Sequence, residues 1–234
     1  IDVNGPIKPI STMELTLPDG TKHSEEVYAT IEESHYAKEQ CDVRVGDCWC
    51  KGDLKHYDVV FKGKTMSAKL SLDGTIPAWR SQTGSIFFGD NEEHYFAWLP
   101  AIPEGKAIAD VTYDGDKELH LEGSGYHDHN WGNISMLKLM HHWYWGRAKI
   151  GDYVVVSSYI YANKKDGYKT TPIFMLAKNG TILTDDAVKY LKYEEKDFVK
   201  DPYTKRHVAR TLVYDYNDSE NGLHYRITYK KGDE

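Results

Sequence analysis

The sequence predicts an all-β protein with antiparallel sheets, and three observations support this fold class. Short stretches of alternating apolar and polar residues recur along the 234 residues, separated by turns rich in Gly, Asp and Pro. The 18 Tyr and 6 Trp favour strands and commonly line ligand cavities. Helical periodicity is scarce. Many short strands with frequent turns indicate a barrel or a sandwich, and an antiparallel barrel can enclose a ligand-sized interior.

The clearest single element is a hairpin in the first third of the chain. Tyr57–Phe61 and Thr65–Leu72 have strand character, and Lys62-Gly63-Lys64 joins them as a turn. Alternation along the second strand places its apolar side chains on one face and its polar side chains on the other. The remaining predicted strands are Met13–Leu17, Ile86–Phe88, Tyr95–Leu99, Ala107–Tyr113, Glu118–Glu122, Tyr153–Ala162, Ile173–Ala177, His207–Tyr216 and Leu223–Lys230.

One segment fits a helix and a strand equally well. Asp185–Phe198 has room for a short helix, but its Tyr and Leu residues also suit a strand. Elsewhere, Gly123 and Gly125 interrupt the strand pattern. We therefore place a boundary between two β subdomains there, one at 1–124 and the other at 125–234.

Composition excludes several classes of function. A formal net charge of −7 argues against a nucleic-acid surface, which needs a basic stripe. No apolar run approaches the roughly 18 residues expected of a membrane-spanning helix. Three N-glycosylation sequons, which begin at Asn133, Asn179 and Asn217, point weakly toward an exported protein. Because the chain begins at Ile1 rather than Met, we expect residues upstream of it.

The three cysteines leave several alternatives open. An odd number does not make a disulfide framework, although a bridge between Cys41 and Cys48 is possible. A metal knuckle formed by Cys41, Cys48 and Cys50 is the second alternative. We favour the third, in which the cysteines are isolated, partly buried thiols.

The stretch from Tyr126 to Gly132 differs from the rest of the chain. It contains one acid, two His, one Asn and two aromatic residues, and such a cluster is costly to bury in an ordinary strand. A similar mixture follows at His141–Arg147. In an extended strand, the two-residue period puts Tyr126, Asp128 and Asn130 on one face and His127, His129 and Trp131 on the other.

If these two stretches are neighbouring strands, they can line one cavity. In the second stretch His141, Trp143 and Trp145 share a face. A carboxyl group in an apolar pocket resists ionisation, so Asp128 can deliver a proton at neutral pH. Aromatic rings around it stabilise a developing cation. This combination predicts protonation of an alkene or an epoxide.

Other interpretations of the same residues remain open. A buried polar network that joins two sheets has a similar composition. His127 and His129 have a common metal-ligand spacing, with His141 or His142 as a third ligand. Asp128 would point to the opposite face, however, and we expect no bound transition metal. No nucleophile-elbow, P-loop or dinucleotide motif is present.

The run Gly123-x-Gly-Tyr-His-Asp-His-Asn-Trp-Gly132, followed by Trp143-Tyr-Trp-Gly146, resembles the signature of the carotenoid 1,2-hydratase (hydroxyneurosporene synthase) family. This superfamily also includes AttH-like proteins, kievitone hydratase and fungal lipocalin-like Diels–Alderases. Gly84–Gly89 and Tyr95–Pro100 are similar to segments upstream of the signature. The resemblance therefore covers roughly Gly84–Gly151.

The resemblance implies two lipocalin-like β-barrel subdomains that pack together and hold an apolar ligand. It places the proton donor at Asp128, with Tyr126 beside it, and we expect Asn130 to help orient the acid. We take as substrate-binding residues Trp98, His127, His129, Trp131, His141, Trp143 and Trp145. Family members are usually longer, which implies that this chain is a fragment or a compact relative.

The sequence thus predicts an enzyme that hydrates or cyclises a double bond in an isoprenoid or polyketide-like molecule, without a cofactor. The alternative is a non-catalytic carrier of an apolar ligand, which needs a cavity but no poised acid. In both cases the partner is a hydrophobic small molecule, and the oligomeric state stays open. The aromatic-rich strands predict a cavity of at least about 300 Å³ near Trp143.

Overall fold

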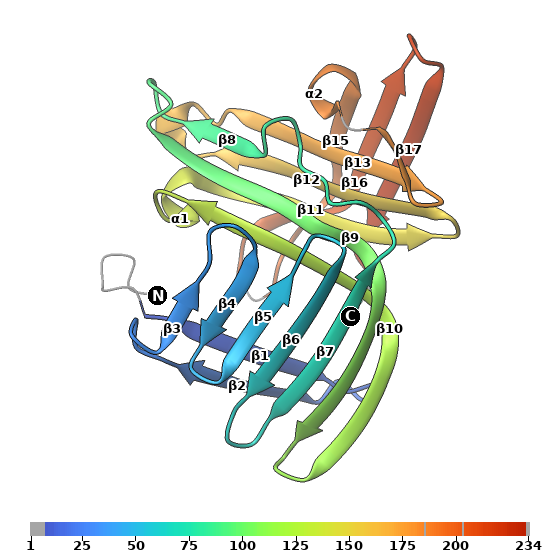
Figure 1. Ribbon diagram of the computed structural model, residues 1–234. Coiled ribbons are helices and arrows are strands. Elements are labelled where there is room, and N and C mark those ends of the chain that lie inside the picture. Colours follow the sequence, from blue (N-terminus) through green and yellow to red (C-terminus); the bar gives the residue numbers. More distant parts are fainter. Residues whose placement is uncertain (1–7, 185, 203, 233–234) are drawn as a thin grey trace. The chain divides into compact units, whose positions relative to one another are not determined.

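The computed structural model describes residues 8–184, 186–202 and 204–232, and nearly all of its elements are antiparallel strands (Figure 1). The predicted all-β class is confirmed. The chain packs as two compact units, each discontinuous in sequence. The first unit combines the chain up to Trp79 with Pro100–His129, and the second combines Arg80–Leu99 with the chain from Asn130 onward. The predicted boundary between residues 124 and 125 lies inside a strand of the first unit.

The first unit contains a two-stranded hairpin and most of an eight-stranded sheet. The hairpin consists of β1 (Ile10–Thr16) and β2 (Lys22–Tyr28). The large sheet has the order β10-β9-β7-β6-β5-β4-β3, and β8 pairs with β9 outside that order. Its strands are β3 (Ser34–Tyr36), β4 (Cys41–Val45), β5 (Cys48–Gly52), β6 (His56–Lys62), β7 (Ser67–Gly74), β8 (Ser85–Phe88), β9 (His94–Tyr113) and β10 (Lys117–Gly132).

The predicted hairpin of β6 and β7 is confirmed, and its register builds an aliphatic face. Val59 lies opposite Leu70, and Phe61 lies opposite Ala68. The next strand continues the pattern, because Ala109 of β9 lies opposite Leu70. One face of the sheet is therefore apolar over several strands.

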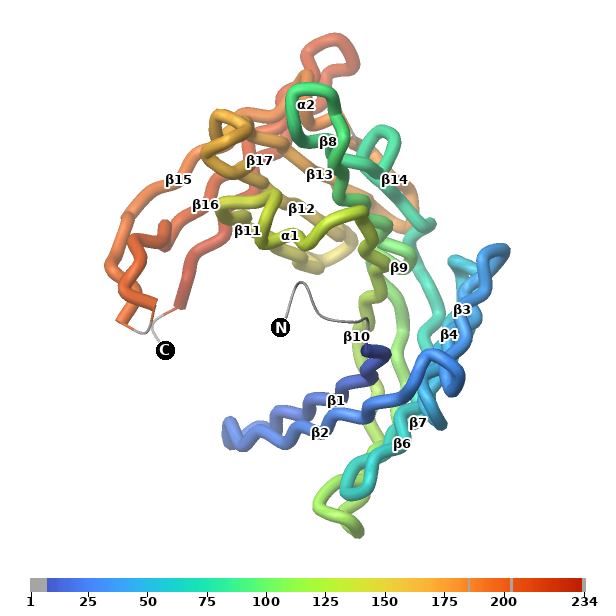
Figure 2. The backbone as a smooth tube through the Cα atoms, turned by 90° about the vertical axis from the view of Figure 1, so that its left-hand side faces the viewer, coloured from blue at the N-terminus to red at the C-terminus, as the bar shows by residue number. Residues whose placement is uncertain are grey.

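The β1–β2 hairpin packs against this aliphatic face and crosses β6 and β7 at a steep angle (Figure 2). Met13 and Leu15 of β1 contact the buried side chains of Cys48, Phe61 and Met66. Glu25 of β2 ties the hairpin to the turn before β7, because its carboxylate accepts backbone N–H groups of residues 64–66. The hydrogen bond from the Met66 N–H is 2.7 Å long.

β9 is one long strand where the sequence predicts two shorter ones. Pro100 and Pro103 lie in its middle and are buried. They are tolerated because β9 changes partners there: β8 pairs with residues 94–97 and β7 pairs with residues 105–112. A proline between two partners removes no hydrogen bond from either ladder. The carbonyl of Pro100 accepts the Trp79 N–H instead, at 3.0 Å.

The second unit is built from two further antiparallel sheets. The four-stranded sheet contains β11 (Met140–Ile150), β12 (Tyr153–Ala162), β13 (Thr170–Lys178) and β14 (Thr181–Thr184). The three-stranded sheet contains β15 (Leu191–Lys200), β16 (His207–Asp218) and β17 (Leu223–Lys230). The short helices are α1 (Met136–Leu139), α2 (Ala187–Tyr190) and the 3-10 turn η1 (Lys164–Asp166).

The ambiguous segment after β14 contains both a helix and a strand. Asp186 caps α2, since its carboxylate accepts the Lys189 N–H at 3.2 Å. The chain then passes directly into β15 at Leu191. Asp185, where the predicted segment begins, lies outside the described residues.

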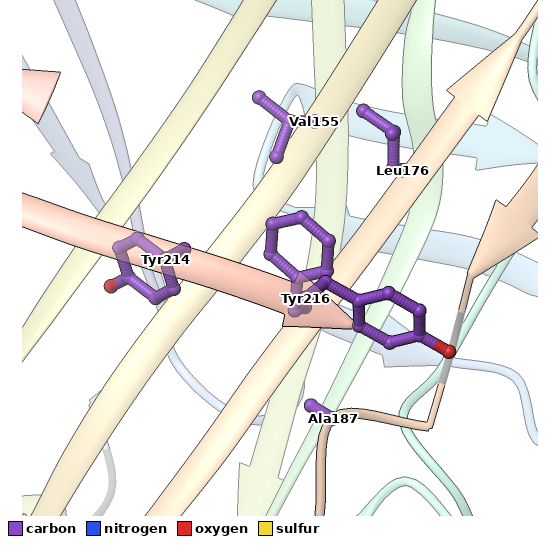
Figure 3. Close-up of a cluster of buried hydrophobic side chains, with 6 residues drawn as sticks. Val155, Leu176, Ala187, Tyr214 and Tyr216 are labelled. Atoms are coloured by element: carbon purple, nitrogen blue, oxygen red, sulfur yellow. The ribbon is translucent and has the colours of Figure 1, made fainter. Parts of the chain in front are cut away.

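Aromatic rings fill the core of the second unit. Phe174 of β13 stacks on Tyr214 and Tyr216 of β16, with ring centroids 6.2 and 5.7 Å apart. Figure 3 shows Tyr216 between Leu176 and Ala187. The two sheets of this unit are joined by these rings.

Across the described residues, no sheet closes into a barrel, so the closed form of the predicted barrel is not confirmed. In the same residues, no helix has the length and apolar character needed to cross a membrane.

Candidate functional site

Strand β10 presents alternate residues to two different faces of the first unit. A Cβ atom on Gly125 would meet the side chains of Leu72 and Ala107, so Gly125 faces the aliphatic side. Two residues later, the His127 ring lies against the Tyr57 ring with centroids 4.2 Å apart. The even-numbered residues therefore point to the other side of the sheet, as the period of a strand requires.

On that other side, Tyr126 and Asp128 form a hydrogen-bonded pair. The Tyr126 hydroxyl donates to Oδ2 of Asp128 at 2.9 Å, and both side chains are half-buried. Residues two apart in a strand share a face, so this bond follows directly from the local sequence. It holds the carboxyl group of Asp128 in one orientation.

A second carboxylate on the same side of the sheet was missed by the sequence analysis. Glu104 of β9 is only 1% exposed. The Ser124 hydroxyl lies 2.9 and 3.0 Å from its two carboxylate oxygens. A buried acid held by a designated donor has the properties of a functional group. The available signal was an acid placed directly after the apolar run Ala101–Pro103.

A cavity of about 490 Å³ lies on the aliphatic side of the first unit. Strand β1 and the aliphatic face of the large sheet border it, and it is open to solvent on one side. The residues that line it include Met13, Leu15, Val43, Val45, Cys48, Cys50, Val59, Phe61, Ala68, Leu70, Ala109, Val111 and Leu121. Asp128 faces the opposite side of β10 and does not line this cavity, and neither does Trp143.

One end of the aliphatic face is more polar. The thiols of Cys41 and Cys50 lie 3.8 Å apart, and a ring nitrogen of His127 lies within 4.8 Å of both. Burial lowers the pKa of His127. Burial, assisted by the Cys41 thiol, raises the pKa of Cys50 to about 12, and burial raises the pKa of Tyr57 to about 12. Among the described residues, Cys41, Cys50 and His127 are the group best suited to hold a metal.

The second predicted stretch lies on β11 in the second unit. Trp143 and Trp145 share an exposed face, at 42% and 48% exposure, as the alternation predicts. However, β10 and β11 belong to different sheets. The condition that they are neighbouring strands is therefore not met.

The opposite face of β11 carries a polar cluster that sequence reasoning did not identify. His142 stacks on Tyr161 with ring centroids 4.3 Å apart. The Tyr161 hydroxyl donates to Glu195 at 2.7 Å. Burial and the neighbouring His141 lower the pKa of His142. Tyr161 and Glu195 lie 34 residues apart on strands of two different sheets, and no local sequence pattern reveals how those sheets pack.

The remaining predicted residues are spread over both units. Trp98 is buried, and its backbone N–H donates to the Gly84 carbonyl at 3.0 Å. His129, Asn130 and Trp131 are exposed. The structure thus brings Tyr126 and Asp128 together and separates His127 from them. Asn130, Trp131, His141, Trp143, Trp145 and Trp98 belong to the second unit.

Two curated proteins match short segments of this chain with more than 30% sequence identity. The chain is 38% identical to the quinolone epoxide rearrangement protein penF of Penicillium thymicola, over 24% of this chain and 15% of that protein. It is 34% identical to the hydroxyneurosporene dehydrogenase of Chlorobaculum tepidum, over 34% of this chain and 26% of that protein. The chain therefore aligns with only a minor part of either relative's length.

Solved structures with low sequence identity share the fold. The kievitone hydratase of Nectria haematococca superposes with a TM-score of 0.60 at 15% identity, over 91% of this chain and 65% of that one. The sequence model of the Diels-Alderase-like family matches residues 10–230, which include both units. The chain belongs to the Diels-Alderase-like family.

Proposed function

We propose that this protein is a cofactor-independent enzyme that hydrates or cyclises a double bond in a hydrophobic isoprenoid or polyketide-like molecule. Family membership supports an enzyme of natural-product chemistry. One similar structure is that of a kievitone hydratase, whose name refers to a hydration, and one relative is named a quinolone epoxide rearrangement protein. The finer assignment depends on the residues of β10.

The observation that carries the proposal is the hydrogen bond between Tyr126 and Asp128. In the acid form, the Asp128 carboxyl gives its proton to one alkene carbon, and a C–H bond forms as the π bond breaks. The adjacent carbon becomes a cation. Water adds to that cation in hydration, or a second π bond adds in cyclisation, and the proton released returns to the carboxylate. General acid catalysis of this kind contributes roughly 10²–10⁴-fold.

Tyr126 would position the acid. Its hydroxyl holds one carboxyl oxygen at 2.9 Å, so the other oxygen has a defined direction relative to the strand. A donor held in one orientation loses less entropy on reaching the transition state than a freely rotating one.

The experiment begins with mass spectrometry of lipophilic compounds that copurify with the protein, which supplies candidate substrates. Asp128→Asn keeps the shape of the side chain but removes the transferable proton. We expect turnover to fall by roughly 10²–10⁴-fold while ligand affinity and melting temperature change little. Asp110→Asn is the matched control, since Asp110 is an exposed carboxylate bound to His120 and should leave turnover intact. Full activity of Asp128→Asn would refute the mechanism.

A carrier of apolar ligands is the second candidate, and one observation favours it. The cavity of about 490 Å³ lies on the side of the sheet away from Asp128 and has an aliphatic lining. Its volume is within the range of small-molecule sites. A carrier would bind the copurifying compound without converting it, and Asp128→Asn would then change neither binding nor product composition.

A further inference from the structure

Two thiols and an imidazole meet on the aliphatic side of the first unit, apart from the proposed acid. The Sγ atoms of Cys41 and Cys50 are 3.8 Å apart. Together with a ring nitrogen of His127, these ligand atoms all lie within 4.8 Å of one another, and all three residues are half-buried. We propose that Cys41, Cys50 and His127 bind one Zn²⁺ ion.

The distances suit a tetrahedral site. Two thiolates bound to zinc at about 2.3 Å, at a tetrahedral angle, are separated by about 3.8 Å. The separation between Cys41 and Cys50 is also 3.8 Å. An imidazole nitrogen at about 2.0–2.1 Å from the metal lies about 3.6 Å from each sulfur. Since the ligand atoms lie within 4.8 Å of one another, the His127 nitrogen needs to approach each sulfur by no more than about 1.2 Å, which a side-chain rotation provides.

The fold assembles this trio through one row of residues across three strands. Cys41 of β4 lies opposite Gly52 of β5, and Gly52 lies opposite Tyr57 of β6. A Cβ atom on Gly52 would lie only 2.2 Å from the Tyr57 ring, so the glycine lets this ring lie over the row. His127 stacks on the same ring. Tyr57 thereby holds the imidazole beside the thiols.

This arrangement also explains how distant strands share a site. In the sheet order, β9, β7 and β6 separate β10 from β5. Neighbouring strands lie about 4.8 Å apart, so a flat sheet would place His127 roughly 19 Å from Cys50. The observed proximity requires the sheet to curl, so that side chains from its two ends meet over the aliphatic face.

A disulfide between the same cysteines fits the register less well. Cys41 lies opposite Gly52 and Cys50 lies opposite Val43, so the two thiols are diagonal neighbours. Diagonal Cα atoms are about 7–8 Å apart in antiparallel pairs. Disulfides span about 4.4–6.8 Å between Cα atoms. A bound metal joins the thiols without moving the backbone.

The environment of His127 also favours metal binding over an arrangement in which Cys41, Cys50 and His127 merely contact one another. Among the residues that the structure describes, His127 has no hydrogen-bond partner for its ring nitrogens. A half-buried polar atom without a partner is unfavourable. Soft thiolates combined with an imidazole are ligands that zinc prefers. Because Cys50 also lines the cavity, the site lies at the cavity's edge.

Three protein ligands leave a fourth position for water or for a donor atom of a cavity ligand, as in catalytic zinc sites. The proposal does not depend on the proposed function, because it uses neither Asp128 nor a turnover measurement. It concerns a metal ion bound by side chains on the other face of β10.

The test uses the full chain, purified under a reductant that does not bind metals. Zinc is added, excess metal is removed by gel filtration, and bound zinc is measured by elemental analysis. We expect one zinc ion per chain. Replacing zinc with cobalt should produce thiolate-to-cobalt charge-transfer absorption in the near ultraviolet and the d–d bands of a tetrahedral site. The cobalt spectrum needs no variant, so misfolding cannot obscure it.

Variants locate the site. Cys41→Ser and Cys50→Ser should abolish the charge-transfer band, and His127→Ala should weaken zinc binding by more than the roughly 10–100-fold that loss of an outer-shell partner causes. Cys48→Ser and His129→Ala are the matched controls and should retain one zinc ion. Cys48 is on the same strand as Cys50, but its sulfur interacts with the backbone of Lys62.

Three results would overturn the proposal. The first is reduced protein that retains no zinc and shows no cobalt charge-transfer band. The second is zinc that remains bound after Cys41→Ser or Cys50→Ser. The third is a thiol count showing that Cys41 and Cys50 stay oxidised as a disulfide in the reductant.

Discussion

The two units of this protein fill their interiors with different side chains. The first unit covers one face of its large sheet with aliphatic residues and leaves a cavity of about 490 Å³ against β1. The second unit joins two sheets through stacked rings, among them Phe174, Tyr214 and Tyr216. Each ring buries roughly 150–250 Å² and keeps few rotamers. A core of rings is therefore rigid and full, whereas the aliphatic face leaves room for a ligand.

Several tyrosines of the second unit also form hydrogen bonds through their hydroxyl groups. Tyr229 accepts a hydrogen bond from Ser157 at 3.1 Å, and Tyr161 donates to Glu195 at 2.7 Å. Such networks select one packing arrangement because a misplaced ring leaves a buried polar atom unsatisfied. The aliphatic face of the first unit has no such requirement and can adapt to different apolar ligands. We therefore expect an apolar ligand to bind inside the first unit rather than inside the ring core of the second unit.

The largest expected effect is in the ring core. Phe174→Ala should lower the free energy of unfolding by about 3–5 kcal/mol, since it removes a fully buried ring from a packed cluster. Val59→Ala, at the cavity wall of the first unit, should cost only about 1–2 kcal/mol. Urea unfolding of both variants measures the contrast. Equal losses would show that the two interiors do not differ in packing.

Enlarging a small side chain should also affect the two units differently. Ala177→Leu overfills the second unit and should destabilise it by about 1–3 kcal/mol, because Ala177 is fully buried. Ala109→Leu projects into the cavity and should leave stability nearly unchanged while weakening the binding of an apolar fluorescent probe. Unaltered probe binding in Ala109→Leu would show that the probe uses a different site.

A smaller, pH-dependent effect on stability is expected at Glu25, which links the β1–β2 hairpin to the turn before β7. Backbone N–H groups, that of Lys64 foremost, lower the pKa of Glu25. A lowered folded-state pKa gives stability that is present above the unfolded-state pKa and is lost as the pH falls through the folded-state value. Glu25→Gln should therefore lower the melting temperature at pH 7. The difference from the unaltered protein should shrink at acid pH, and a difference that stays constant down to pH 2–3 would contradict this role.

Most strands could be predicted because their signals are local. Tyr153–Ala162 and Leu223–Lys230 have the predicted bounds, and the β6–β7 hairpin follows from its turn and its alternation. The joining of Tyr95–Leu99 with Ala107–Tyr113 could not be predicted in the same way. Pro100 and Pro103 indicate an interruption, and only the exchange of partner strands at that point makes them compatible with one continuous strand.

The candidate site was predictable only where it lies within one strand. The pairing of Tyr126 with Asp128 follows from the two-residue period. Glu104 and Ser124 are 20 residues apart and meet only through the pairing of β9 with β10. The cysteines and His127 are far apart in the sequence, and we expected no metal there. The curl of the sheet brings His127 to Cys41 and Cys50, and no sequence period encodes that curl.

Because the segments of the two units alternate along the sequence, the strands pair in a fixed order as the chain is synthesised. The free edge of β7 is fully paired only when β9 has been translated as far as Thr112. At about 5–20 residues per second, the 38 residues from Gly74 to Thr112 take roughly 2–8 s. During that interval the nascent chain exposes the unpaired edge of β7. The segment Arg80–Leu99 also lacks the rest of the second unit, because residues from Asn130 onward have not yet been synthesised. Chaperones that shield nascent strands would therefore act on this protein before its first unit is complete.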